Sequence, residues 1–465
     1  MRTYTLENRG RLSLYEYLYR CIREDILDGS LAAGERLPSK RALAEHLHIS
    51  VMTVEGAYQQ LEAEGYVYTQ PKRGFFVAEL EGPRPVSKPV STLPPEPRET
   101  PVWRLDLKSN RVDTSRFPVA TWIRLTRQAL SEERESLMHP VPHQGLPALR
   151  QAIAQDLGEY KGMSVSPEQI VVGAGAEYLY LLLAQLLGQE AVFAVEDPGY
   201  PKIRQVYGKC GVTCRPVPLD SQGMAPGALE AAGATVVHLS LAHHYPTGLV
   251  TPIGRRQALL RWAEQTDAVI IEDDYDSEFR FTGRPIPPLQ SIDTAGRVVY
   301  MNTFSQTISP AMRVGFMVLP SRLLDRYRQE LNFYSCTVPA LEQHVLARFL
   351  GQGHYEQHLS RMRKEYRQRR DAVLSAFRSS PFRDQITISE QGAGLHFLLR
   401  LDTSEPDTVL RDRAAALGVR LGFLSEYAAL PSPAYAHTLV VNYASLNPEA
   451  LGSAMDLLSQ ILVPS

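Results

Sequence analysis

The chain opens with apolar residues at the spacing of one helix face. Leu14, Leu18, Ile22 and Ile26 are each four residues apart, and Gly29 follows as a stop signal. This segment is therefore expected to be a helix with one buried side.

Two further helices and a hairpin are expected directly afterwards. Ser39 and Ser50 each precede a run with helical spacing, where a serine hydroxyl can cap the first turn. Residues 66–69 and 75–77 are aromatic and β-branched, which favours two strands joined by the basic turn at 70–74. Three helices and a hairpin in so short a stretch predict a compact unit whose last helix is free to enter a DNA major groove.

Further along, apolar runs alternate with helical stretches. This alternation is typical of a doubly wound α/β fold with a mostly parallel sheet, in which ligands bind at the carboxyl ends of the strands. From about Leu341 we expect a long charged helix through Arg370, followed by the mixed strands and helices of a smaller domain. The expected strands are 169–172, 191–195, 235–239, 268–271 and 298–301.

A proline-rich stretch separates these two patterns. Between Glu79 and Thr100 prolines recur and no helical or alternating pattern survives, which is typical of a semi-rigid linker. The expected domains are a small helical domain over 1–78, a linker over 79–103, a large domain over 104–340 and a small domain over 341–465.

Composition narrows the class of protein. The 465 residues carry a net charge of −2, so nucleic-acid binding must rest on a local basic face rather than on bulk charge. The chain has neither a run of about 20 apolar residues nor the apolar core of a signal peptide, and we expect it to stay in the cytoplasm, off the membrane. Its four cysteines predict neither a disulfide framework nor a paired zinc motif.

The small helical domain carries a more specific signal. Residues 34–47 read GERLPSKRALAEHL, 50–54 read SVMTV, and 57–66 read AYQQLEAEGY. Over its whole length this domain resembles the GntR-type winged helix-turn-helix, which implies binding to double-stranded DNA. Val51 departs from that family, which usually has an arginine at this position. The alternative to a DNA-binding domain is a helical domain with cations scattered over its surface. The resemblance implies a DNA-facing set of residues that is suited to phosphate contacts. The set is Lys40, Arg41, Ser50, Thr53, Lys72, Arg73 and Gly74.

Four polar clusters follow expected strands of the larger part of the chain. They contain a glycine-bearing turn, an aromatic ring, a carboxylate two residues before a phenol, and a hydroxyl-rich loop. Such groups at strand ends are suited to binding a phosphorylated ligand. The clusters are GAGAE at 173–177, EDPGY at 196–200, EDDYDSEF at 272–279 and NTFSQTISP at 302–310, with Arg313 shortly beyond.

Together these clusters resemble the fold type I aminotransferases, an α/β fold. Further matches lie at 144–150, 245–248, 358–371 and 394–397. With the first domain included, nearly the whole chain resembles the MocR group of GntR regulators. That group joins a winged helix by a linker to a domain that binds pyridoxal 5′-phosphate.

The resemblance implies a role for each residue of the clusters. Tyr200 would stack on the pyridine ring of the cofactor, Asp273 would pair with its protonated nitrogen, and Tyr275 would bond its ring hydroxyl. Taken singly, Tyr200 could equally be a core residue, Asp273 a helix or loop cap, and Arg313 part of a surface ion pair. Their occurrence together, in the order that the family has along the sequence, favours the cofactor. The phosphate would be held by Ser305, Arg313 and the amides of Ala174, Gly175 and Ala176 through charge-assisted hydrogen bonds.

Two departures from the family bear on catalysis. Gln306 falls where the family has its Schiff-base lysine, and an amide nitrogen is not a nucleophile. Val440 falls where aminotransferases have the arginine that grips the substrate carboxylate. We therefore expect no catalysis and no covalent attachment, while noncovalent binding of pyridoxal 5′-phosphate, its amine form or an adduct stays open.

Three histidines near one expected strand raise the question of a metal. His238, His243 and His244 lie along the strand and its exit, with no carboxylate at ligand spacing in the sequence. We expect no metal site.

The favoured hypothesis is a DNA-binding transcription regulator with a small-molecule effector. A homodimer is implied because the aminotransferase-like fold shares its site between two subunits. Two alternatives stay open: a working aminotransferase with an accessory DNA-binding domain, and a large domain that serves only to dimerise the DNA readers.

Overall fold

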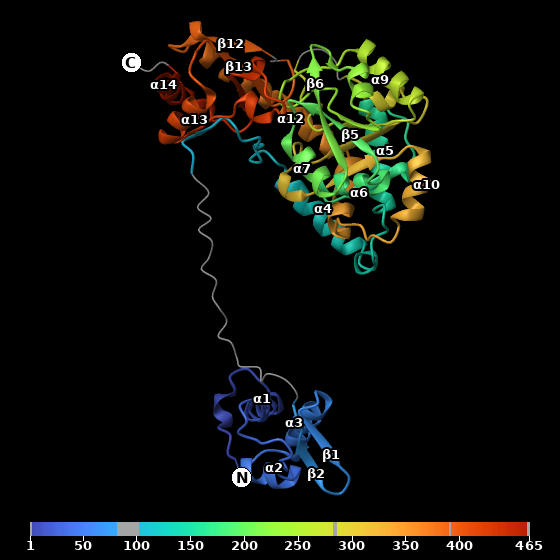
Figure 1. The fold of residues 1–465 in the computed structure, drawn as a ribbon, viewed down its shortest axis with the longest axis vertical. Coiled ribbons are helices and arrows are strands. Elements are labelled where there is room, and N and C mark those ends of the chain that lie inside the picture. The colour runs from blue at the N-terminus through green and yellow to red at the C-terminus, as the bar shows by residue number, and fades with distance from the viewer. Residues whose placement is uncertain (1, 81–101, 282–285, 390–391, 463–465) are drawn as a thin grey trace. The chain divides into compact units, whose positions relative to one another are not determined.

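The structure is a computed structural model that describes residues 2–80, 102–281, 286–389 and 392–462. The chain forms two compact units, Met1–Thr100 and Pro101–Ser465, which are described separately (Figure 1). The linker expected over 79–103 lies mostly outside the described residues. In the described ranges, no helix has both the length and the apolar character needed to cross a membrane.

The first unit contains the three helices and the hairpin that the sequence predicts. Ser39 and Ser50 cap the second and third helices, because their hydroxyls accept hydrogen bonds from the backbone N–H groups of Ala42 (3.2 Å) and Thr53 (3.1 Å). The apolar faces of the helices enclose a core that includes the fully buried Tyr58. The elements are α1 (Leu14–Leu27), α2 (Lys40–Leu47), α3 (Val51–Ala63), β1 (Val67–Gln70) and β2 (Gly74–Val77).

The second unit is organised around an eight-stranded sheet with the order β4-β11-β10-β9-β8-β5-β6-β7. All five strands predicted from the apolar runs are present, and the neighbours from β10 through β6 run parallel. β11 runs antiparallel to both β4 and β10. The strands are β4 (Ile170–Gly173), β5 (Val192–Asp197), β6 (Thr213–Asp220), β7 (Gly223–Met224), β8 (Val236–Leu239), β9 (Val269–Asp273), β10 (Val298–Thr303) and β11 (Gly315–Val318).

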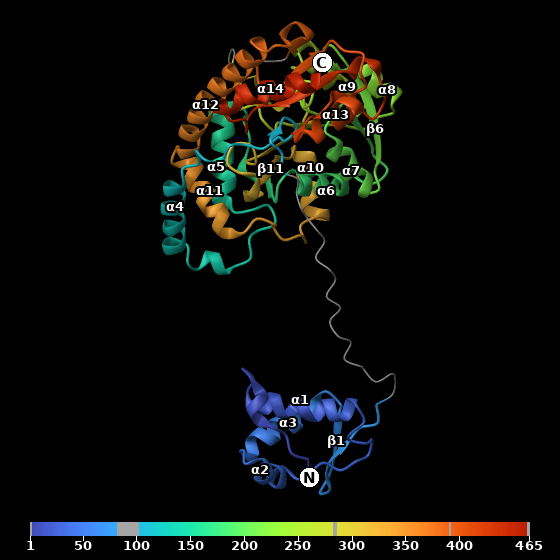
Figure 2. The same ribbon diagram turned by 90° about the vertical axis from the view of Figure 1, so that its left-hand side faces the viewer.

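Helices cover both faces of this sheet (Figure 2). Strand β4 shows why: Val171 belongs to the core cluster that includes α6, α7 and α10, whereas Ile170 and Val172 point to the opposite face and belong to the cluster that includes α4, α5 and α11. Helices α8 and α9 cover the rest of that opposite face. The helices are α4 (Val119–Glu132), α5 (Pro147–Asp156), α6 (Ala176–Leu187), α7 (Pro201–Lys209), α8 (Pro226–Ala231), α9 (Ile253–Gln265), α10 (Ser321–Glu330) and α11 (Ala340–Gly351).

The prediction of one long helix from Leu341 through Arg370 was wrong, because the chain breaks at Gly353, whose φ of 74° no α-helix accommodates. The two resulting helices are α11, which packs on the large sheet, and α12, whose later part packs with the small sheet. The short strand β3 (Leu105–Asp106) pairs with β14 (Val419–Arg420). The first residues of this unit therefore pack with its C-terminal part. The remaining elements are α12 (His354–Arg378), β12 (Ile386–Ser389), β13 (His396–Leu401), α13 (Asp407–Ala416), β14 (Val419–Arg420), β15 (Thr438–Asn442) and α14 (Leu451–Leu462).

Candidate functional site

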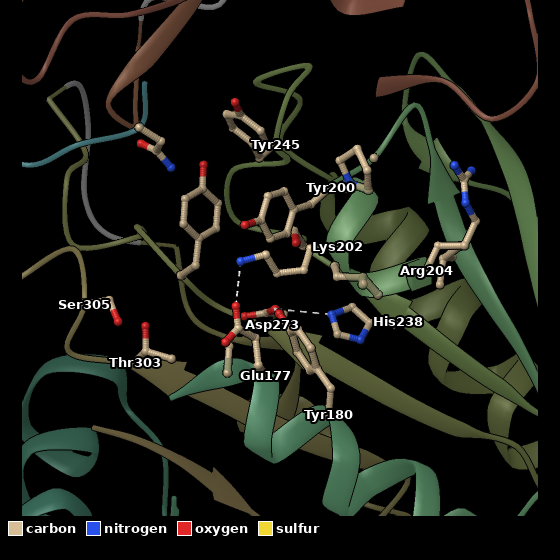
Figure 3. Close-up of a pocket in the computed structure, with 18 of the residues that line it drawn as sticks. Glu177, Tyr180, Tyr200, Lys202, Arg204, His238, Tyr245, Asp273, Thr303 and Ser305 are labelled. Atoms are coloured by element: carbon tan, nitrogen blue, oxygen red, sulfur yellow. Dashed lines mark hydrogen bonds and ion pairs between the residues drawn. The ribbon is translucent and has the colours of Figure 1, made fainter. Parts of the chain in front are cut away.

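A pocket of about 300 Å³ opens at the carboxyl ends of the parallel strands (Figure 3). Its lining comes from the ends of β5, β8, β9 and β10 and from the first turns of α6 and α7. Parallel strands end at the same edge of a sheet, which explains why clusters far apart in the sequence meet here. Of the predicted site residues, those that line the pocket are Ala176, Tyr200, Asp273, Tyr275, Ser305, Gln306 and Arg313.

Asp273 ends strand β9 at the buried floor of the pocket. Its Oδ2 accepts hydrogen bonds from the hydroxyl of Tyr180 and pairs with Nε2 of His238 at 3.2 Å. Among the described residues no hydrogen bond reaches Oδ1. One carboxylate oxygen is thus fixed by the protein, and the other is open to a donor on a ligand, such as a pyridinium N–H.

Two tyrosines line the space above Asp273. Tyr275 Oη is buried and has no hydrogen-bond partner among the described residues, and burial raises the pKa of this phenol well above its usual value. An orphaned buried hydroxyl needs a partner, and a ligand hydroxyl would provide one. Tyr200 is 43% exposed and its ring lies edge-on to that of Tyr245 at 6.2 Å. This ring is therefore accessible for stacking.

One end of the pocket is cationic. Arg313 donates from one guanidinium nitrogen to the carbonyl of Ala174 (3.1 Å) and to Glu177 (2.9 Å). Gly175 permits this approach: its φ is 84°, and a Cβ there would lie 3.0 Å from the guanidinium. The amide of Ala174, which we expected to bind phosphate, donates instead to Oγ1 of Thr337 at 2.9 Å.

Sequence reasoning missed two residues of this cationic end. Glu177 was part of the glycine-bearing cluster but received no role, and Lys202 follows Tyr200 by two residues in the first turn of α7. Lys202 Nζ lies 2.6 Å from Oε1 of Glu177, so a lysine does lie in the pocket although none is near Gln306 in the sequence. The position of Lys202 two residues after the EDPGY cluster was the available signal.

Gln306 lies in the turn after β10 and lines the pocket. Its Oε1 is buried without a hydrogen-bond partner among the described residues. The carboxamide oxygen of this pocket residue is thus an acceptor without a donor among the described residues.

Val440 lies in strand β15 and is fully buried. It belongs to an apolar cluster with Leu398, Leu424, Tyr245 and Tyr427, and the last two tyrosines also line the pocket. The hydroxyls of Tyr245 and Tyr427 are 2.9 Å apart. This wall of the pocket is therefore aromatic and uncharged.

The three histidines near β8 have carboxylate partners that the sequence spacing did not reveal. His238 pairs with Asp273, and His243 Nδ1 lies 3.1 Å from both oxygens of Asp276. Possible ligand atoms of His243, Asp276 and His396 lie within 4.8 Å of one another in the buried interior. Hydrogen bonding accounts for the His243–Asp276 contact without a metal. The absence of a metal stays a prediction.

The first unit presents its predicted DNA-facing residues on α2, α3 and the hairpin. Arg41, Lys72 and Arg73 are exposed, whereas Lys40 forms an ion pair with Glu55 of α3. The side chains of Ser50 and Thr53 bond each other at 2.8 Å at the start of α3, and Gly74 begins β2. Met52, which sequence reasoning did not single out, is 81% exposed in the same first turn.

Comparison with known proteins agrees with both units. Residues 103–447 match the family of class I and II aminotransferases, and residues 14–77 match the gntR family of bacterial regulatory proteins. The second unit shares its fold with kynurenine aminotransferase of Pyrococcus horikoshii, with a TM-score of 0.68, 22% identity and coverage of 78% of this chain and 91% of that one.

Two curated relatives span both units. The HTH-type transcriptional regulator YdeL of Bacillus subtilis is 35% identical over 412 residues, which cover 88% of this chain and 89% of YdeL. The regulatory protein MocR of Rhizobium meliloti is 30% identical over 468 residues, which cover 97% of this chain and 94% of MocR. The chain therefore belongs to the MocR-type transcription regulators, in which a GntR DNA-binding domain is fused to an aminotransferase-like effector domain.

Proposed function

We propose that the second unit binds an effector of the pyridoxal 5′-phosphate type without a covalent bond and does not catalyse transamination. The carrying observation is Gln306, which lines the pocket where the resemblance places the cofactor-attaching lysine. A carboxamide nitrogen is not a nucleophile, so this position supplies neither attachment nor the proton transfer of a lysine. The pocket then binds a ligand and reports its presence to the DNA-binding domain.

The other pocket residues fit such a ligand. The open Oδ1 of Asp273 faces a site for a protonated ring nitrogen, the orphaned Oη of Tyr275 can meet a ring hydroxyl, and the ring of Tyr200 can stack. Ser305 and Arg313 would hold the phosphate. Charge-assisted hydrogen bonds contribute roughly 1.5 to 3 kcal/mol each, and about 8 kcal/mol gives micromolar affinity, so these contacts suffice for reversible binding. The cofactor, when bound, supplies a carbonyl or amine on an electron-withdrawing ring.

The aromatic wall narrows the class of effector. With buried Val440 where an arginine would grip a carboxylate, the wall offers the uncharged Tyr245 and Tyr427 instead. We therefore propose that the effector is the phosphorylated pyridine alone or an adduct whose second part is uncharged.

We also propose that the protein acts in the cytoplasm as a homodimer on a two-half-site DNA operator. Helix α4 supports a dimer, because Val119, Ile123 and Leu130 share one face and are 56%, 46% and 49% exposed. An exposed apolar patch is a candidate surface for a protein–protein contact. A second copy is the occupant that matches a palindromic operator.

The central experiment compares the wild type with Gln306→Lys after incubation with pyridoxal 5′-phosphate and borohydride reduction. We expect intact-protein mass spectrometry to show no added pyridoxyl group on the wild type and one on the variant. Calorimetry with pyridoxamine 5′-phosphate, which cannot attach covalently, should show saturable binding by both proteins. A pyridoxyl group that peptide mapping places on Lys202 of the wild type, inside the pocket, would sink the proposal.

Absence of calorimetric binding by both proteins would instead favour a large domain that serves only to dimerise the DNA readers. Amino-acid turnover by the wild type would favour the working aminotransferase.

A further inference from the structure

The cationic end of the pocket already holds an anion that belongs to the protein. Glu177 lies in the first turn of α6, and its two carboxylate oxygens contact two different cations. Oε1 lies 2.6 Å from Nζ of Lys202, and Oε2 lies 2.9 Å from the guanidinium of Arg313. Figure 3 shows the side chain of Lys202 reaching back to Glu177 beside Asp273.

All three groups are charged near neutral pH. The hydrogen bond from Lys202 lowers the pKa of Glu177, and the same bond raises the pKa of Lys202. Two cations and one carboxylate leave a single net positive charge at this end of the pocket. Without the carboxylate the two cations would match the charge of a phosphate dianion.

The three side chains are partly exposed, which leaves Glu177 free to move away from the two cations. Their exposed fractions are 39% for Glu177, 45% for Lys202 and 48% for Arg313, so none is locked in the core. A carboxylate at this exposure can swing into solvent at small cost, whereas Arg313 is held by the carbonyl of Ala174.

We propose that Glu177 is an internal competitor that occupies the phosphate position of the empty pocket, and that Lys202 is a second cationic ligand for the phosphate of the effector. This inference rests on the proposed function. Entry of a phosphate then requires Glu177 to release Arg313 and Lys202. The affinity for phosphorylated ligands is set below what the two cations would give alone, so the pocket fills only when such ligands are abundant.

The test measures binding of pyridoxamine 5′-phosphate and of unphosphorylated pyridoxamine to the full-length protein by calorimetry. Glu177→Gln removes the competing charge while keeping the side-chain shape, and we expect it to bind pyridoxamine 5′-phosphate about tenfold more tightly, equivalent to about 1.4 kcal/mol. Its affinity for pyridoxamine should stay that of the wild type. Glu190→Gln, at an exposed position away from the pocket, is the matched control and should change neither affinity.

The role of Lys202 is tested in the variant that lacks the competitor. In the Glu177→Gln background, Lys202→Met should weaken binding of pyridoxamine 5′-phosphate by about fivefold and leave pyridoxamine unaffected. Wild-type binding combined with equal or weaker binding by Glu177→Gln would overturn the inference, because Glu177 would then serve to position Arg313. Absence of binding by both proteins would overturn the proposed function and this inference together.

Discussion

His244 shows how burial of a single side chain makes the stability of the second unit depend on pH. The residue is buried at the exit of β8, and burial lowers the pKa of its imidazole to about 3. In the unfolded chain the same group titrates at about 6.5. Because the folded pKa is the lower one, the unfolded state binds an extra proton as the pH falls below about 6.5, and the folded state loses stability there.

We therefore expect His244 to lower the free energy of unfolding by up to about 1.4 kcal/mol per pH unit as the pH falls from about 6.5 to 4. His244→Gln keeps a polar atom for Thr247, whose hydroxyl lies 2.6 Å from Nδ1, and should reduce this slope. Urea denaturation at several pH values measures it. His139→Gln, at an exposed histidine, should leave the slope unchanged, and an unaltered slope in His244→Gln would contradict a neutral buried imidazole.

At the scale of residues, the sequence identifies side chains that end a strand but not the partners that fix them. Asp273 and Tyr275 were placed in the pocket because each closely follows an apolar run. The pairing of His238 with Asp273 depends on β8 lying beside β9, and the strand order contains crossovers that local patterns do not encode. Lys202 was missed for the same reason: its partner Glu177 comes from a different strand–helix connection.

At the scale of elements, apolar runs located β4, β8, β9 and β10 because these strands are buried along their whole length, although β11, which is equally buried, was missed. β6 was not singled out, since Val217 is its single buried residue and it contains Pro216 and Pro218. The helix expected from Leu341 failed because helical spacing continues across Gly351 and Gly353 even though the backbone turns there. Periodicity therefore predicts the presence of helices better than their ends.

Helix α2 carries a prediction about DNA affinity. Arg41 is exposed and forms no ion pair among the described residues, whereas its neighbour Lys40 is paired with Glu55. A phosphate contact contributes equally to all sequences and releases counterions. We expect Arg41→Ala to weaken operator binding by roughly tenfold and to reduce the slope of log affinity against log salt by about one.

Fluorescence anisotropy with labelled operator across a salt series measures both quantities. Arg261→Ala, at an exposed position on α9 of the second unit, should alter neither. A loss of affinity for one operator sequence with an unchanged salt slope would show that Arg41 reads a base rather than a phosphate.

At the scale of the whole molecule, the proposed dimer links the exposed face of α4 to DNA affinity. A charge placed at Ile123, in the middle of this face, would be buried without a partner if a second copy packs there, and it should dissociate the dimer. Each DNA-binding domain would then bind one half-site alone. Loss of the second, linked binding event lowers affinity for a two-half-site operator by about a hundredfold or more.

We accordingly expect Ile123→Asp to elute as a monomer in size-exclusion chromatography with light scattering and to bind the full operator about as weakly as the wild type binds a single half-site. Ile253→Asp changes an equally apolar side chain that is 60% exposed on α9, so it controls for the cost of a surface charge and should remain a dimer. A dimeric Ile123→Asp with full operator affinity would move the interface elsewhere on the second unit.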